Sequence, residues 1–246
     1  MVNRDDIIKN LNEYLKINEI NDYCPNGLQV EGSEQVTKII TSVSASLELF
    51  EIASAENAEM IIVHHGILWH KDSPVVKGTL KNRLVSLLSS DITLLAYHLP
   101  LDMHPEVGNN ILAAQGLGLE QIQPLGKIGV KGITQDFPVN EFITKVDSFY
   151  RSKSLVFEYG PAVVNKVGIC SGGGEHDITL AIEDGLHIFI SGEAGEPTMH
   201  LAKEGNIHFL AAGHYATERL GITVLGSYLT KTFDVKVQFI DLPNPV

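Results

Sequence analysis

Short apolar runs alternate with amphipathic segments along most of the chain. Runs rich in β-branched residues predict strands at residues 38–46, 59–65 and 186–193, at 92–102 with a break at Pro100, at 166–174 entering a glycine turn, and at 206–218 running into a loop or the start of a helix. Apolar residues at helical spacing predict helices at residues 5–17, 47–58, 78–90, 106–118, 176–185 and 196–205. Strands that alternate with helices in this way predict a layered α/β fold with a largely parallel or mixed sheet.

The two halves of the chain repeat this order of elements. Ile39 and Val167 begin equivalent strands, and His64 and Ser191 end the next pair of strands. The separations are 167 − 39 = 128 and 191 − 64 = 127 residues, so the register is kept. We therefore predict two structurally similar β-α-β-α-β halves, at residues 1–124 and 125–246, with an inserted α+β segment at about 125–165 in the second half.

Composition narrows the function classes. The chain has 246 residues and a net charge of −12, which disfavours general binding to nucleic acids or to anionic membranes. Its two cysteines form no CxxC pattern, so they fit a reducing compartment rather than a disulfide framework. No apolar run approaches the roughly 20 residues of a membrane span, and the first residues lack a signal-peptide core. We expect a cytoplasmic protein.

Side chains that can bind metals follow several predicted strands. They are His64 and His65, His98 with Asp102, Glu193, and His214 with Glu218. In open α/β sheets, ligands gather beyond the carboxyl ends of the strands. Adjacent strand residues point to opposite sides, so two neighbouring histidines suit two ions rather than one. His214 and Glu218 are four residues apart, which places them on one face of a helical turn.

This donor set favours a particular class of metal site. Imidazole nitrogens with carboxylate oxygens suit zinc, iron, manganese, nickel or cobalt, and they do not suit calcium or a thiolate site. Two such ions close together could share a hydroxide and activate it for attack on a substrate. The sequence therefore predicts two divalent cations and no organic cofactor site.

Several motifs together resemble one family. IIVHHGILW, AYHLPLDMHPEVGNN and GHYATER, with NGLQVEG, SGGG and ISGE, are similar to the Nif-three-like family, also called GTP cyclohydrolase 1 type 2 homologs or dinuclear metal centre proteins. The resemblance covers essentially the whole chain. It implies a toroidal homohexamer of α/β subunits with dinuclear sites facing an internal cavity. It also implies that His64 and Asp102 hold one ion, that His65 and His214 hold the other, and that Glu218 bridges them.

Three functions are consistent with these observations. The first is a dinuclear metal-dependent hydrolase, which would act on a nucleotide such as GTP if the resemblance extends to activity. His98 and Glu193 are its candidates for acid–base catalysis or for support of the ligands. The second is a metal-dependent phosphoesterase, and the third is a ring-shaped metal-binding scaffold or regulatory protein without turnover. The expected partners are further copies of the chain and a small-molecule substrate, with neither nucleic acid nor membrane.

Some motifs have simpler explanations. The SGGG stretch at residues 171–174 either makes a tight strand–helix turn, which we favour, or cradles a phosphate. Trp69, the only tryptophan, is expected to pack in the core, with a wall of the site as the alternative. We interpret the remaining histidines as structural or surface residues, at His70, His104, His176, His187, His200 and His208.

Overall fold

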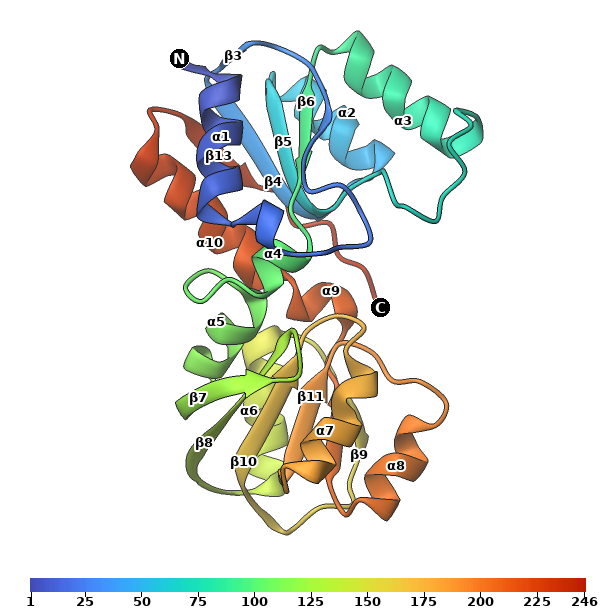
Figure 1. Ribbon diagram of the computed structural model, residues 1–246, viewed down its shortest axis with the longest axis vertical. Helices are drawn as coiled ribbons and strands as arrows, with labels where there is room; N and C mark the ends of the chain where they lie inside the picture. Colours follow the sequence, from blue (N-terminus) through green and yellow to red (C-terminus); the bar gives the residue numbers. More distant parts are fainter. The chain divides into compact units, whose positions relative to one another are not determined.

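A computed structural model describes residues 1–246, and its chain divides into two units (Figure 1). Unit 1 contains Met1–Leu101 and Gly221–Leu242, and unit 2 contains Asp102–Leu220 and Pro243–Val246. These bounds differ from the predicted halves, 1–124 and 125–246. The reason is that residues 102–124 join the second sheet and its core, whereas 221–242 return to the first sheet.

Unit 1 is built on a five-stranded sheet in the order β13-β4-β5-β6-β2. Its strands are β2 (Gly27–Val30), β4 (Lys38–Ser44), β5 (Met60–His65), β6 (Thr93–Ala96) and β13 (Lys236–Phe239). Only β2 pairs in the antiparallel direction. A two-stranded antiparallel pair, β1 (Val2–Asn3) with β3 (Gln35–Val36), lies outside this sheet.

Helices cover both faces of the first sheet, as the buried strands require. Figure 1 shows α1 (Arg4–Tyr14) and α10 (Arg219–Thr232) on one face, and α2 (Leu47–Ala55) with α3 (Gly78–Ser89) on the other. The rings of Tyr14 and Tyr228 stack 4.1 Å apart between α1 and α10. On the opposite face, Phe50 of α2 and Leu87 of α3 pack against Ile61 and Val63 of β5. A short 3-10 helix, η1 (Ile17–Glu19), follows α1.

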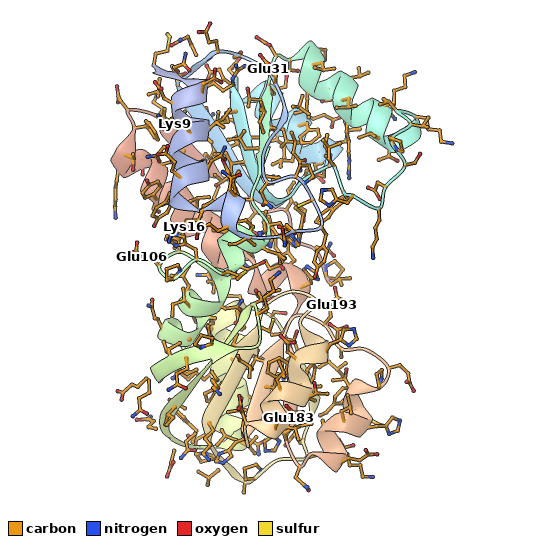
Figure 2. The ribbon with its side chains drawn as sticks, in the orientation of Figure 1. Lys9, Lys16, Glu31, Glu106, Glu183 and Glu193 are labelled. Carbon is orange, nitrogen blue, oxygen red and sulfur yellow. The ribbon has the colours of Figure 1, made fainter.

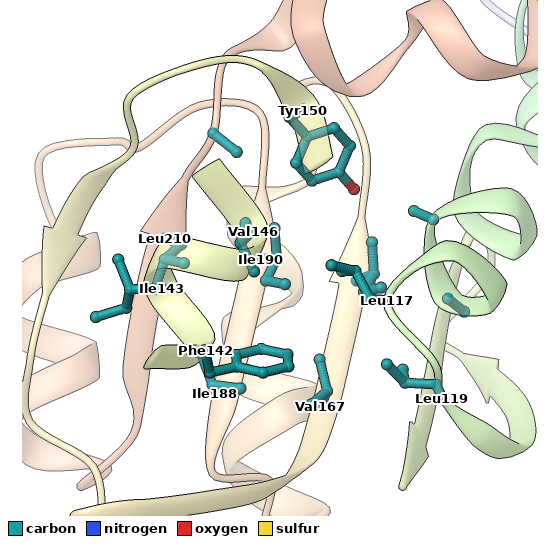
Figure 3. Packing of buried hydrophobic residues seen from close by; sticks show 14 of the residues in the cluster. Leu117, Leu119, Phe142, Ile143, Val146, Tyr150, Val167, Ile188, Ile190 and Leu210 are labelled. Atoms are coloured by element: carbon teal, nitrogen blue, oxygen red, sulfur yellow. The ribbon is translucent and has the colours of Figure 1, made fainter. Parts of the chain in front are cut away.

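Unit 2 is built on a six-stranded sheet in the order β7-β8-β10-β11-β12-β9. Its strands are β7 (Glu120–Leu125), β8 (Gly129–Pro138), β9 (Leu155–Phe157), β10 (Val163–Cys170), β11 (Ile188–Ser191) and β12 (His208–Ala211). One face carries α5 (Asn109–Gly116) and α6 (Val139–Tyr150), with the apolar cluster drawn in Figure 3. The other face carries α7 (Ile178–Glu183) and α8 (Thr198–Glu204), which pack on Phe189 and Phe209.

The predicted α/β fold class is confirmed in both units. β4-α2-β5-α3-β6 and β10-α7-β11-α8-β12 are each a β-α-β-α-β run with three parallel strands. The predicted insertion supplies β8, α6 and β9, so its strands extend the second sheet rather than standing apart from it. No helix in the structure combines the length and the apolar character needed to cross a bilayer.

The predicted strand at residues 92–102 ends a few residues earlier than its expected break at Pro100. The segment 92–102 forms β6 only as far as Ala96, and Leu99–Asp102 is a short helix, α4. Pro100 explains the change, because proline lacks an N–H and is accommodated in the first turn of a helix but not in a sheet. Two further elements that the sequence analysis did not predict, α10 and β13, complete unit 1.

Candidate metal centre

The carboxyl end of β5 presents the two adjacent histidines in unit 1. His64 is fully buried and His65 is half-buried, and their ring centroids lie 4.6 Å apart. The chain then turns at Gly66, where an added Cβ would lie 2.2 Å from Gln29 Oε1. The same oxygen accepts a hydrogen bond of 2.8 Å from the Ile67 N–H. The glycine of the HHG motif therefore lets Gln29 approach and fix the loop that follows the histidines.

A third imidazole joins this pair from the neighbouring strand. His98 follows the end of β6, and its ring centroid lies 5.1 Å from that of His64 and 5.6 Å from that of His65. One ligand nitrogen from each of the three rings lies within 4.8 Å of the other two. Unit 1 alone thus brings together three of the predicted site residues in an arrangement that could hold a metal ion.

Each of these imidazoles is held through its Nδ1 atom. His64 Nδ1 donates to the Tyr97 carbonyl oxygen at 2.9 Å, and His98 Nδ1 donates to Asp22 Oδ1 at 2.8 Å. His65 Nδ1 shares a hydrogen bond of 3.1 Å with Ser44 Oγ. A carbonyl or carboxylate oxygen only accepts, so His64 and His98 each carry a proton on Nδ1, and a metal would bind through Nε2. Metal-ligating histidines are usually oriented in this way.

Asp22 is a site residue that the sequence analysis missed. Besides His98 it accepts hydrogen bonds from Asn26 Nδ2 at 2.8 Å and from the Leu99 N–H at 2.9 Å. Burial raises the pKa of this carboxyl, but the hydrogen bonds from His98 and Asn26 and the charge of His98 outweigh it and lower the pKa to about 2. Asp22 lies 76 residues from His98 in the sequence, and only its place in a turn-rich segment hinted at a special role.

In unit 2, the GHYATE motif forms a helical turn, α9 (His214–Thr217). His214 Nε2 lies 3.1 Å from Glu218 Oε2, and His214 Nδ1 lies 2.5 Å from Glu193 Oε1. Burial lowers the pKa of His214, but the hydrogen bonds and charges of Glu218 and Glu193 outweigh burial and raise the pKa to about 9. Glu193, labelled in Figure 2, thus orients His214 through Nδ1, as Asp22 orients His98.

The SGGG turn closes around the same pair of residues. Gly172 has a φ of +62°, and an added Cβ would lie 2.1 Å from Glu218 Oε1 and 3.2 Å from His214 Nε2. Its N–H donates to Thr217 Oγ1 at 3.0 Å, and its carbonyl accepts from the Gly192 N–H at 2.9 Å. These contacts support the tight-turn interpretation of the motif, because the backbone of Gly172 faces side chains of unit 2 rather than an open anion site.

Asp102 and Glu218 are the buried carboxylates of unit 2, with 4% and 3% of their surface exposed. Asp102 Oδ1 accepts from Asn109 Nδ2 at 2.7 Å and from Ser171 Oγ at 3.2 Å. The sequence analysis did not identify Asn109 or Ser171, because partners of this kind depend on loops that meet only in the folded unit. Unit 2 therefore supplies one imidazole and carboxylates, each held by neighbouring polar groups.

The two cysteines are not joined to each other. Cys24 and Cys170 are both free and buried. Burial, with the charge of Asp22, raises the pKa of Cys24 to about 12, and burial also raises the pKa of Cys170. Both thiols are therefore protonated near pH 7. Cys24 nevertheless lies beside the imidazoles of unit 1, because one ligand atom each of Asp22, Cys24 and His98 lies within 4.8 Å of the others.

Comparison with known proteins identifies similar chains over the full length. The model of the Duf34/NIF3 family (NGG1p interacting factor 3) matches residues 2–245. A GTP cyclohydrolase 1 type 2 homolog from Haemophilus influenzae is 45% identical over 241 residues, covering 96% of each chain. A protein of the same name from Escherichia coli is 46% identical over 239 residues, again covering 96% of each chain.

Solved structures show the same similarity. A structure described as protein ybgI, of unknown function, has a TM-score of 0.96 and 43% identity, with both chains covered completely. A protein from Thermus thermophilus has a TM-score of 0.91 and 32% identity, also over both complete chains. The similarity in sequence and in fold thus extends over the whole length of the chain.

Proposed function

The chain belongs to the Duf34/NIF3 family, and from this premise we propose that it is a hydrolase that depends on two divalent metal ions. One observation carries the proposal. The four candidate imidazoles, His64, His65, His98 and His214, are each held at Nδ1 by a protein group. Histidines that are oriented through Nδ1 in this way ligate a metal through Nε2, and the donor set fits zinc, iron, manganese, nickel or cobalt.

In this proposal, His64 and Asp102 hold one ion, His65 and His214 hold the other, and Glu218 bridges the two. The assignment of donors from both units to the same pair of ions rests on the matched sequence motifs. The close grouping of the three imidazoles within unit 1 supports a ligand role for His98 beside His64. The hydrogen bond that Glu193 accepts from His214 Nδ1 supports an orienting role for Glu193 rather than one in proton transfer.

Two such ions would lower the pKa of a water molecule between them and polarise the bond to be broken. The protein supplies the orientation for this chemistry. Asp22 and Glu193 fix two of the imidazoles, and Asn109 with Ser171 fixes the carboxylate of Asp102. Because these groups are themselves hydrogen-bonded, the ligand atoms can keep their positions while the substrate reacts.

The substrate we propose is a guanine nucleotide, which the name of the relatives supports. Addition of one water at C8 of guanine would open the five-membered ring to a formamide, and a second water would release formate. A phosphoesterase acting on the same nucleotide would instead break a P–O bond and release phosphate. The two reactions are therefore separated by their products.

The test is incubation of the protein with GTP and Zn²⁺, Mn²⁺ or Fe²⁺, with formate and phosphate measured separately. We expect formate from the wild type and none from Glu218→Gln, whereas Glu196→Gln, at an exposed position, should retain activity. Phosphate without formate would favour the phosphoesterase. Bound metal without either product would favour a metal-binding scaffold.

We also propose that the chain forms a cytoplasmic homohexameric ring. The family resemblance supports the ring, and the two isolated thiols suit a reducing compartment. Sedimentation velocity tests the assembly, since a monomer or dimer at micromolar concentration would contradict it.

A further inference from the structure

Two aromatic side chains lie against the imidazoles of unit 1 without belonging to the metal ligands. The Trp69 ring meets the His98 ring edge-on, with centroids 5.2 Å apart, and lies 6.0 Å from the His65 ring. The Tyr23 ring lies 6.2 Å from the His98 ring. Trp69 is half-buried, whereas Tyr23 is 61% exposed. Both rings therefore border the imidazole group and present surface to solvent.

Tyr23 is exposed although its backbone is held firmly. Its N–H donates to Asp22 Oδ1 at 2.6 Å, and its carbonyl accepts from the His70 N–H at 2.8 Å. Gln29 ties the same loop to the one after β5, since its Nε2 donates to the Pro25 carbonyl at 3.1 Å. A single exposed tyrosine is ordinary on a protein surface. A tyrosine held in place at both backbone groups, beside a candidate metal centre, is pre-ordered for contact with a ligand.

We propose that Tyr23 and Trp69 form an aromatic platform that binds the ring of a planar nitrogen heterocycle, the base of a purine nucleoside. This inference rests on the proposed function, which it deepens by naming how the substrate would be recognised. Aromatic side chains stack on the faces of bases, and this stacking contributes affinity without any contact to phosphate. The rings in contact with Tyr23 and Trp69 are imidazoles, so the platform we propose recognises the ring of the ligand.

Trp69 reports on the platform directly because it is the only tryptophan in the chain. Guanosine should quench its fluorescence saturably, and ribose 5-phosphate, which lacks the heterocycle, should not. Tyr23→Leu should weaken guanosine binding roughly 5- to 150-fold, the range expected for loss of one stacking contact. Tyr23→Phe, which keeps the ring, should bind like the wild type. Leu88→Ala is the matched control, because Leu88 is also 61% exposed in unit 1 but lies on α3.

The outcomes separate this proposal from the metal-dependent hydrolase. Saturable quenching that depends on Tyr23 supports the platform even if no product forms, and in that case only the hydrolase proposal fails. Bound metal and formate release without quenching would overturn the platform and leave the hydrolase intact. Equal affinity in Tyr23→Leu and wild type would also overturn it. So would a change in sedimentation caused by Tyr23→Leu, because Tyr23 would then serve contact between copies of the chain.

Discussion

Substitution of Gly172 by alanine should remove metal binding while leaving the fold intact. The new Cβ would lie 2.1 Å from Glu218 Oε1, far inside van der Waals contact. Glu218 is 3% exposed, but its carboxylate is the movable end of a side chain, so it should turn aside rather than disrupt the backbone. The group displaced is the proposed bridging ligand. Gly172→Ala should therefore lose most of its metal while it loses only a small part of its stability.

The stability cost can be isolated with a second glycine of unit 2. Gly172 and Gly185 both have a φ of +62°, but an alanine Cβ at Gly185 would meet no heavy atom within 4 Å. Left-handed backbone costs an L-residue about 1–2 kcal/mol, and both variants should lose that amount. For a chain of this size, the loss corresponds to a fall in Tm of about 2–8 °C.

Chemical denaturation of the metal-free proteins and elemental analysis of the metal-loaded ones together provide the assay. Gly185→Ala should be destabilised and fully loaded, whereas Gly172→Ala should be destabilised to a similar extent and depleted of metal. Full loading of Gly172→Ala would refute the reasoning, because the added Cβ would then not disturb Glu218 or His214. Equal depletion in both variants would show that backbone strain alone is responsible.

Three further predictions concern Asp22, the removal of metal, and Glu59. Asp22→Asn should weaken metal binding about 10- to 100-fold by loosening His98, measured by competition with a chelator, and an unchanged affinity would leave Asp22 a purely structural residue. Removal of metal should lower the free energy of unfolding, by about 2.7 kcal/mol for each ion held at 100 times its Kd, and a denaturation midpoint independent of metal concentration would contradict binding to the native state. Glu59 accepts hydrogen bonds from the N–H groups of Thr37 and Lys38. Burial raises the pKa of Glu59, but these hydrogen bonds outweigh burial and lower the pKa below its usual value. Its ionised form therefore stabilises unit 1 above the pKa of the unfolded chain, and this contribution disappears as the pH falls through the lowered native pKa. Glu59→Gln should reduce stability at neutral pH and flatten its dependence on acid, and parallel curves for variant and wild type would contradict this.

The sequence predicted the end of β5 well because the chemistry there interrupts an apolar pattern. His64 and His65 follow Ile61–Val63 without a break, and β5 ends at His65 as expected. The segment after His98 was predicted less well. Its apolar residues continue the pattern of β6, and only Pro100 signalled that a helix would begin.

The groups that orient the ligands were beyond prediction for a different reason. Asp22 reaches His98 across 76 residues, and Ser171 reaches Asp102 across 69, so no local pattern joins either pair. The position of α10 and β13 in unit 1 was unpredictable for the same reason, because β13 pairs with β4 from the far end of the chain. Periodicity describes which face of an element is buried, but it does not describe which distant loops meet.

The proposed metal centre consists of two ions in each chain, with Glu218 as the bridging ligand. Elemental analysis of untagged protein, with the wild type beside His65→Ala and Glu218→Ala, tests this most directly. His176→Ala is the control, because its side chain is 83% exposed in unit 2. We expect two ions in the wild type and in the control, about one in His65→Ala, and none in Glu218→Ala. Two ions retained by Glu218→Ala, or a wild-type protein that takes up no zinc, manganese or iron, would contradict it.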